Sequence, residues 1–225
     1  HAEEIFRAAD DLSAMLRMSG QRRRVLRIGA LATLSRNFQM TFLEPLLGRD
    51  DVEIVLRSGP QEALLRGLEA LALDVVLTNL APARDASSPY LVQRIAEQPV
   101  SLIGKPSRVG AERDIEALLS GQPLIVPTME NTIRIGFDAL CDRLGIQPTL
   151  RAEVDDMALI RVLARADMGL AVIPPIVVRD ELASGTLEEL VRLSSLPETF
   201  YAITVRRRFP NPLLSILVEN LAAHS

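Results

Sequence analysis

The chain has 225 residues, of which 48% are hydrophobic and 24% charged, and its formal net charge is −4 at pH 7. This length allows one large globular domain or two small ones, and the negative charge argues against a surface that embraces DNA or an anionic membrane. The single cysteine, Cys141, excludes an intrachain disulfide, and no apolar run reaches the roughly 20 residues that a membrane helix needs.

The first predicted element is a helix over residues 1–20, which Gly20 ends. Along one side of it, apolar residues alternate spacings of three and four, as they do in a coiled coil. We therefore expect a linker helix that joins chains into a homodimer or a tetramer; a helix packed on its own domain is the alternative. The chain opens at His1 inside this helical pattern, which suggests a fragment of a longer protein. The apolar seam consists of Ile5, Ala9, Leu12 and Leu16.

Residues 25–47 predict a buried strand that runs directly into a helix. The strand is apolar on both faces, and the helix then repeats an apolar residue at every fourth position. Thr33 or Ser35 would cap the helix, whose first turn offers bare N–H donors at the carboxyl edge of the sheet. Pro45 is expected to bend the helix. An ordinary βα unit with no ligand is the alternative.

The βα rhythm continues with a strand over residues 52–56, a helix that Pro60 opens and a buried strand over residues 73–77. Strands that alternate with helices pair in parallel through right-handed crossovers. The residues that follow the third strand, Thr78 and Asn79, therefore fall at the same sheet edge as the cap of the first helix.

A second βα module is predicted to follow a long extended segment over residues 90–105, which Pro99 interrupts. Two such modules predict an α/β protein of two Rossmann-like lobes around a cleft. The expected helices cover residues 115–119, 133–144, 157–165 (capped by Asp155), 176–182 and 212–221, and the expected strands cover residues 123–127, 150–154, 169–173 and 200–205.

The sequence contains few candidates for catalytic residues. The only histidines, His1 and His224, lie at the chain ends, so an interior Ser-His-Asp or Cys-His pair is excluded. The chain has no phosphate loop and no GxGxxG motif. The acidic run from Glu153 to Asp156 could hold a cation, but a strand end followed by a capped helix is the favoured interpretation. We therefore predict no enzyme, no cofactor and no metal site.

Several phrases, taken in order, resemble the effector-binding region of LysR-type transcriptional regulators, from roughly residue 24 to the end. The Asp at position 167 and the Leu at position 71 stand where that family favours a glycine, and Asp tolerates the left-handed backbone that such a turn needs. Residues 34–36, 153–156 and 200–203 most resemble the branch that regulates sodium/proton antiporter genes. The ordered phrases are Arg27-Ile28-Gly29, Leu43 to Leu47, Leu73 to Leu77, Glu153 to Asp156, Gly169 to Pro174 and Phe200 to Ile203.

The resemblance implies a fold like that of type 2 periplasmic binding proteins: one regulatory lobe from residues 24–98 and 206–225, a second from residues 99–205, and the linker helix over residues 1–20. It implies a cytoplasmic regulator that binds a small effector and reaches DNA only through a winged helix-turn-helix domain, which these residues lack. A solute-binding protein of a transporter and a sodium- or cation-responsive regulator are the alternatives.

Combined with the strand-end geometry, the resemblance places the effector between the lobes. Hydroxyls and unpaired N–H groups favour an organic anion. Glu130 argues for a cation instead. We expect Arg36 and Arg134 to be solvated rather than directed at the ligand. The predicted effector-binding residues are Thr33, Leu34, Ser35, Thr78, Asn79, Pro99, Thr128, Met129, Glu130, Asn131, Thr132, Phe200 and Tyr201.

Overall fold

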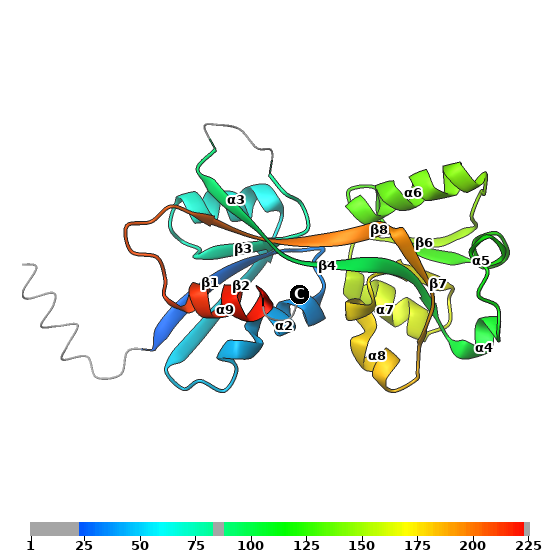
Figure 1. The fold of residues 1–225 in the computed structure, drawn as a ribbon, viewed down its shortest axis with the longest axis horizontal. Helices are drawn as coiled ribbons and strands as arrows, with labels where there is room; N and C mark the ends of the chain where they lie inside the picture. The colour runs from blue at the N-terminus through cyan, green and yellow to red at the C-terminus, as the bar shows by residue number, and fades with distance from the viewer. Residues whose placement is uncertain (1–22, 83–87, 223–225) are drawn as a thin grey trace, which may run out of the picture.

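The computed structural model describes residues 23–82 and 88–222, and in them eight strands form one sheet in the order β2-β1-β3-β8-β4-β7-β5-β6 (Figure 1). Two long antiparallel strands, β4 (Tyr90–Gly104) and β8 (Glu188–Val205), pair from one end to the other and pass through both lobes. The predicted helix over residues 1–20 and its dimerisation seam lie outside the described residues.

The first lobe places helices on both faces of its strands. As predicted, β1 pairs in parallel with both β2 and β3. Helix α3 covers one face, and α2 and α9 cover the other (Figure 1). The elements of this lobe are β1 (Arg24–Leu31), α2 (Arg36–Leu43), the 3-10 helix η1 (Glu44–Leu46), β2 (Val52–Gly59), α3 (Gln61–Glu69), β3 (Val75–Thr78) and α9 (Leu213–Ala222).

The second lobe repeats this plan, with β5 parallel to both β6 and β7. Its apolar residues form one large buried cluster that includes Phe137, whereas the sheet divides the first lobe's core in two. The elements are α4 (Pro106–Val109), α5 (Ile115–Gly121), β5 (Leu124–Pro127), α6 (Thr132–Leu144), β6 (Leu150–Val154), α7 (Met157–Arg165), β7 (Leu170–Ile173), the 3-10 helix η2 (Pro175–Val178) and α8 (Arg179–Ala183).

The two-lobed α/β fold is confirmed, and three local predictions are wrong. Helix α2 ends at Leu43, and Pro45 lies instead in the first turn of η1. The N–H that proline lacks would have no acceptor within the helix at that position, so no hydrogen bond is lost. The cap of α7 is Asp156 rather than Asp155. The last long strand begins at Glu188 rather than residue 200, because its partner β4 is long enough to hold it extended.

Two turns, one in each lobe, hold a residue other than glycine in the left-handed region. Leu71 follows α3 with φ 58°, and Asp167 follows α7 with φ 60°. Arg108 stabilises the second turn, since its Nε donates to Asp167 Oδ1 at 2.7 Å. The prediction that Asp167 tolerates the left-handed backbone of this turn is therefore confirmed. None of the described helices has the length and apolar character needed to cross a membrane.

Candidate functional site

The predicted effector residues of the first lobe begin at the turn between β1 and α2. Ser35 is the N-cap of α2, and its hydroxyl oxygen accepts a hydrogen bond from Phe38 N at 3.4 Å. The side chain is only 4% exposed. Within the described residues, the N–H groups of Arg36 and Asn37 have no acceptor, as expected for a first helical turn. This turn therefore keeps donors and the positive end of a helix dipole available.

The end of β3 uses its two polar residues differently. Thr78 is fully buried, and its hydroxyl donates to Gln61 Oε1 at 2.7 Å and accepts from Leu80 N at 2.9 Å. That hydroxyl is occupied within the lobe. Asn79 reaches out of the lobe instead, and its Nδ2 donates to Glu198 Oε1 of β8 at 2.6 Å.

Glu198 is a functional candidate that the sequence reasoning missed. It lies on β8 opposite Gln98 of β4, one residue from the paired Pro99 and Pro197 where the long strands pass between the lobes. Its side chain is 4% exposed. Burial raises the pKa of this carboxyl to about 7, against the opposing effect of the Asn79 hydrogen bond. The carboxyl can therefore change its charge near neutral pH. Its position just before the predicted Phe200 was the only signal in the sequence.

Phe200 and Tyr201 join the crossing strand to the first lobe. The Phe200 ring stacks on Phe38 of α2, with centroids 3.9 Å apart and an interplanar angle of 14°. Tyr201 pairs with Thr78 across β3 and β8. Both Phe200 and Leu34 are buried in the core of this lobe, at 0% and 2% exposed. These two residues pack in the core beneath the candidate site, and Ser35 and Asn79 supply its polar groups.

The first lobe also touches the second through α2. Asn37 Nδ2 donates to Ile176 O at 2.9 Å and to Val177 O at 3.3 Å, both in η2. Arg179 Nη1 donates to Thr41 Oγ1 at 3.3 Å. These hydrogen bonds attach the helix that Ser35 caps to the opposite lobe. Asn37 was not predicted, because its acceptors lie some 139 residues along the chain.

The predicted turn of the second lobe, from Thr128 to Thr132, makes its hydrogen bonds within that lobe. Thr128 N donates to Val154 O at 3.2 Å, and Asn131 N donates to Thr128 O at 3.0 Å. Asn131 caps α6 by accepting from Ile133 N at 2.9 Å. In the described part of the chain, no hydrogen bond or ion pair joins this turn to the first-lobe residues.

Three residues of this turn, Met129, Glu130 and Thr132, are exposed and can meet a ligand. Met129 is 54% exposed, and Glu130 is fully exposed. The pKa of Glu130 is lowered by a hydrogen bond from its own backbone N–H and by one from the Thr128 hydroxyl. Glu130 therefore carries a negative charge at neutral pH.

The prediction that Arg134 is solvated is wrong. Its side chain is buried, its Nε donates to both carboxylate oxygens of Asp138 at 2.9 Å, and its Nη1 pairs with Glu153. Burial alone would lower the pKa of Arg134, but these hydrogen bonds raise it. The positive charge of Arg134 is therefore paired with carboxylates of its own lobe. Arg36 is exposed as predicted, and it donates to Ser58 Oγ at 3.1 Å.

The acidic run at the end of β6 is likewise used for structure. Glu153 pairs with Arg134, and Asp156 caps α7 by accepting from Ala158 N at 2.8 Å. Among residues 23–82 and 88–222, no group of three His, Cys, Asp or Glu side chains is arranged to hold a metal ion.

A sheet shared by two βα lobes through two crossing strands, with polar turns at the strand ends, defines the class of periplasmic-binding-protein-like ligand-binding domains. The family model "LysR substrate binding domain" matches residues 19–225, and the chain therefore belongs to this family. It is a ligand-sensing regulatory domain of a LysR-type transcriptional regulator, as the sequence predicted. No curated protein sequence matches the chain.

Solved structures share the fold at low sequence identity. The apo regulatory domain of HypT from Salmonella typhimurium is 15% identical, with a TM-score of 0.68 over 91% of this chain and 97% of that one. The regulatory domain of Synechocystis PCC6803 CcmR, in complex with 2-PG, is 16% identical, with a TM-score of 0.67 over 89% and 96%. The LysR family regulator CbnR is 17% identical, with a TM-score of 0.70 over 98% and 76%.

Proposed function

We propose that this domain binds a small organic anion between its lobes, with the anionic group held by the first turn of α2. The observation that carries this proposal is the turn itself. Ser35, a buried hydroxyl, adjoins the bare N–H groups of Arg36 and Asn37 at the positive end of the helix dipole. The HypT regulatory domain has also been solved with a bromide ion bound, which supports an anion in a relative of this fold.

The proposed relay runs through the contacts between α2 and the second lobe. A ligand at the N-terminus of α2 acts on the helix whose Asn37 and Thr41 are hydrogen-bonded to η2 and α8. A ligand that prefers one arrangement of the lobes shifts the population toward it, typically with a coupling of about 1–3 kcal/mol. The linker helix and DNA-binding domains of a cytoplasmic homodimer or tetramer would receive that shift.

The proposed role is regulation without catalysis. The described interior contains no histidine to activate a nucleophile. The buried thiol of Cys141 has its pKa raised to about 11, chiefly by burial, so it stays protonated and unreactive at neutral pH. A substrate screen that finds turnover abolished by a single substitution at Ser35 or Asn79 would contradict this role.

Thermal unfolding with a panel of organic acids tests the proposal. A ligand at a hundred times its dissociation constant stabilises the folded domain by about 2.7 kcal/mol. We expect at least one acid, supplied as its sodium salt, to raise the melting temperature above that in sodium chloride of equal ionic strength. A panel of metabolic mono- and dicarboxylates that leaves the melting temperature unchanged would contradict the anion proposal.

A cation-responsive regulator is the second candidate, and Glu130 is the observation that favours it. This exposed carboxylate is charged at neutral pH, and hydrogen bonds from its own backbone N–H and the Thr128 hydroxyl lower its pKa further. Sodium chloride and choline chloride of equal concentration would then stabilise the domain differently, and Glu130→Gln would remove the difference. Equal melting temperatures in the two salts would dismiss the cation.

A further inference from the structure

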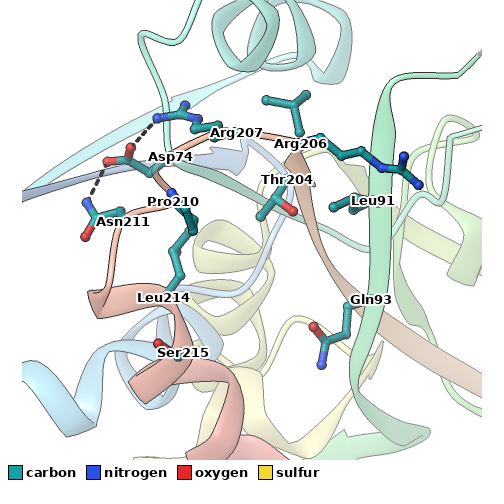
Figure 2. Close-up of a pocket in the computed structure, with 11 residues that line it drawn as sticks. Asp74, Leu91, Gln93, Thr204, Arg206, Arg207, Pro210, Asn211, Leu214 and Ser215 are labelled. Carbon is teal, nitrogen blue, oxygen red and sulfur yellow. Dashed lines mark hydrogen bonds and ion pairs between the residues drawn. The ribbon is translucent and has the colours of Figure 1, made fainter.

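The first lobe contains a cavity whose lining includes none of the predicted effector residues, on the sheet face that α9 covers only in part. Its volume is about 530 Å³, within the range of sites for small molecules. Figure 2 shows Leu91 and Gln93 of β4, Thr204 of β8 and Leu214 of α9 around it. A smaller adjoining cavity of about 330 Å³ continues over Val75 and Ala202.

The topology explains why this face is left open. Leu213 is fully buried, but Leu214, the next residue of α9, is only half-buried. Helix α9 contacts η1, α2 and β4, but it does not fill the space over Leu91 and Gln93, which line the cavity together with Leu214. The described pairing of β4 with β7 covers only Ser101 to Ile103, so β4 is the outermost strand where it passes the cavity. An apolar floor therefore faces solvent beside a strand edge.

The charged groups that line the cavity differ in whether they are paired. Asp74 is buried, and its carboxylate accepts from Arg207 Nη1 at 2.8 Å and from Asn211 Nδ2 at 3.2 Å (Figure 2). It also accepts from Arg27 N at 2.8 Å. Its negative charge is thereby compensated. Arg206 is exposed and makes no ion pair with any described residue. The lining thus presents one uncommitted positive charge.

We propose that this cavity is a second ligand site, separate from the one between the lobes, and that it takes an apolar carboxylic acid. The apolar body would lie against Leu91, Val75 and Leu214, where burial removes hydrocarbon surface from water. The carboxylate would meet Arg206 at the rim. Gln93 and Thr204, whose side chains make no hydrogen bond to another described residue, would be further donors. An ammonium group in the same place would be repelled by the charge of Arg206.

The fluorescent acid 2-naphthoate is a suitable probe, with uncharged 2-naphthalenemethanol as its matched control. We expect the acid to bind more tightly than the alcohol. Arg206→Gln should weaken binding of the acid about tenfold and leave the alcohol within about twofold, because only the acid makes the charge-assisted contact. Arg208→Gln is the control substitution, since the Arg208 guanidinium lies 5.5 Å from the Phe209 ring and outside the lining.

Substitutions that fill the cavity test its location. Leu91 is 45% exposed, so Leu91→Trp should fold normally, block the mouth and weaken both probes at least tenfold. Leu214→Trp fills the floor and should act in the same way. Ser35→Ala should change neither affinity, so this site and the one between the lobes can fail separately.

The proposal is overturned if 2-naphthoate does not bind, or if it binds equally well to Leu91→Trp and Leu214→Trp. Equal weakening of acid and alcohol by Arg206→Gln would overturn the choice of an acid. Sedimentation of the same variants provides the remaining check. If Leu91→Trp dissociates an assembly and the probe does not bind, this face is an interface between copies of the chain and the proposal fails.

Discussion

The two lobes have the same βα plan, but they use their ligand-facing turns in opposite ways. In the first lobe, α2 begins with a buried serine and N–H groups that have no acceptor among the described residues. In the second, Asn131 caps α6 and Arg134 is paired with two carboxylates. Similar topology therefore does not make the two helix N-termini equivalent. The first turn leaves N–H groups open to the proposed anion, whereas the charged side chains at the second are paired within their own lobe.

A similar contrast separates two glutamates of β8, Glu189 in the second lobe and Glu198 at the crossing between the lobes. Glu189 is hydrogen-bonded to Arg192 and to Ser101, and the Arg192 bond is the main cause of its lowered pKa. Glu198 has only the amide of Asn79, and burial raises its pKa. One carboxyl is fixed in its charge, while the other, near the candidate site, can change.

The largest expected effect concerns the aromatic stack that joins α2 to the crossing strand. Phe200→Ala should destabilise the domain by about 3–5 kcal/mol, because it opens a cavity at a fully buried position and removes the stack on Phe38. Urea unfolding would measure the change. Phe209→Ala, at an 81% exposed position, should cost less than about 0.5 kcal/mol. Similar losses for both variants would contradict the packing described here.

The second prediction concerns pH. The folded-state pKa of Glu198 is about 7, above its ordinary value of 4.5, so the folded state binds the proton more tightly. Stability due to this group is therefore fully present below pH 4.5 and is lost as the pH rises through 7. Glu198→Gln removes the free-energy cost of burying an ionised carboxylate. At pH 8 it should therefore stabilise the domain by up to roughly 3 kcal/mol.

Denaturant unfolding of the wild type and Glu198→Gln at pH 5 and pH 8 would measure this effect. The two proteins should differ little at pH 5 and most at pH 8. Glu189→Gln is the matched control on the same strand, and it should lose stability at pH 8 because its carboxylate is paired. A Glu198→Gln variant that is less stable than the wild type at pH 8 would contradict the uncompensated burial.

The third prediction tests the rigidity of the second turn. Arg134→Met should destabilise the domain by about 1–2 kcal/mol, less than a fully buried pair would cost, because the partner carboxylates are 37% and 47% exposed. Affinity for the anion should remain within about twofold of the wild type. Arg143→Met on the same helix, at an exposed position, is the control. A large loss of ligand affinity in Arg134→Met would show that Arg134 serves the ligand after all.

The smallest expected effect is a difference in stability between glycine substitutions at the two left-handed turns. Leu71→Gly should stabilise the domain by about 0.5–1 kcal/mol, because relief of the left-handed strain exceeds the entropy that glycine adds to the unfolded chain. Asp167→Gly should stabilise it less or not at all, since it removes the acceptor of Arg108. Thermal unfolding of both variants would show the difference, and equal gains would contradict the role of Arg108.

The sequence predicted the architecture well because the architecture depends on local patterns. Apolar runs and helical spacing located most strands and helices, and the alternation of strands and helices predicted the parallel pairing that the structure confirms. The errors are of a different kind. The strand from Glu188 contains Ser194-Ser195 and Pro197, which locally indicate a turn; in the structure, the register with β4 shifts at this point, and the pairing on both sides of the shift continues the strand.

The candidate site was less predictable for the same reason. Ser35 could be found, because a cap followed by an apolar helix is visible in sequence. Asn37 and Glu198 could not be found, because their roles come from partners on other elements: backbone carbonyls of η2 for Asn37, and Asn79 for Glu198. The burial of Arg134 likewise depends in part on another element, because Glu153 of β6 pairs with it; its other partner, Asp138, lies only four residues along the same helix.

Calorimetric titration of one organic acid against two cap-region variants tests most directly whether the first lobe holds the anion. The acid is the one that most raises the melting temperature, and the variants are Ser35→Ala and Thr132→Ala, one at the start of each ligand-facing helix. Ser35→Ala should weaken binding about tenfold or more, whereas Thr132→Ala should stay within about twofold of the wild type. Undiminished affinity in Ser35→Ala, with a large loss in Thr132→Ala, would contradict the account.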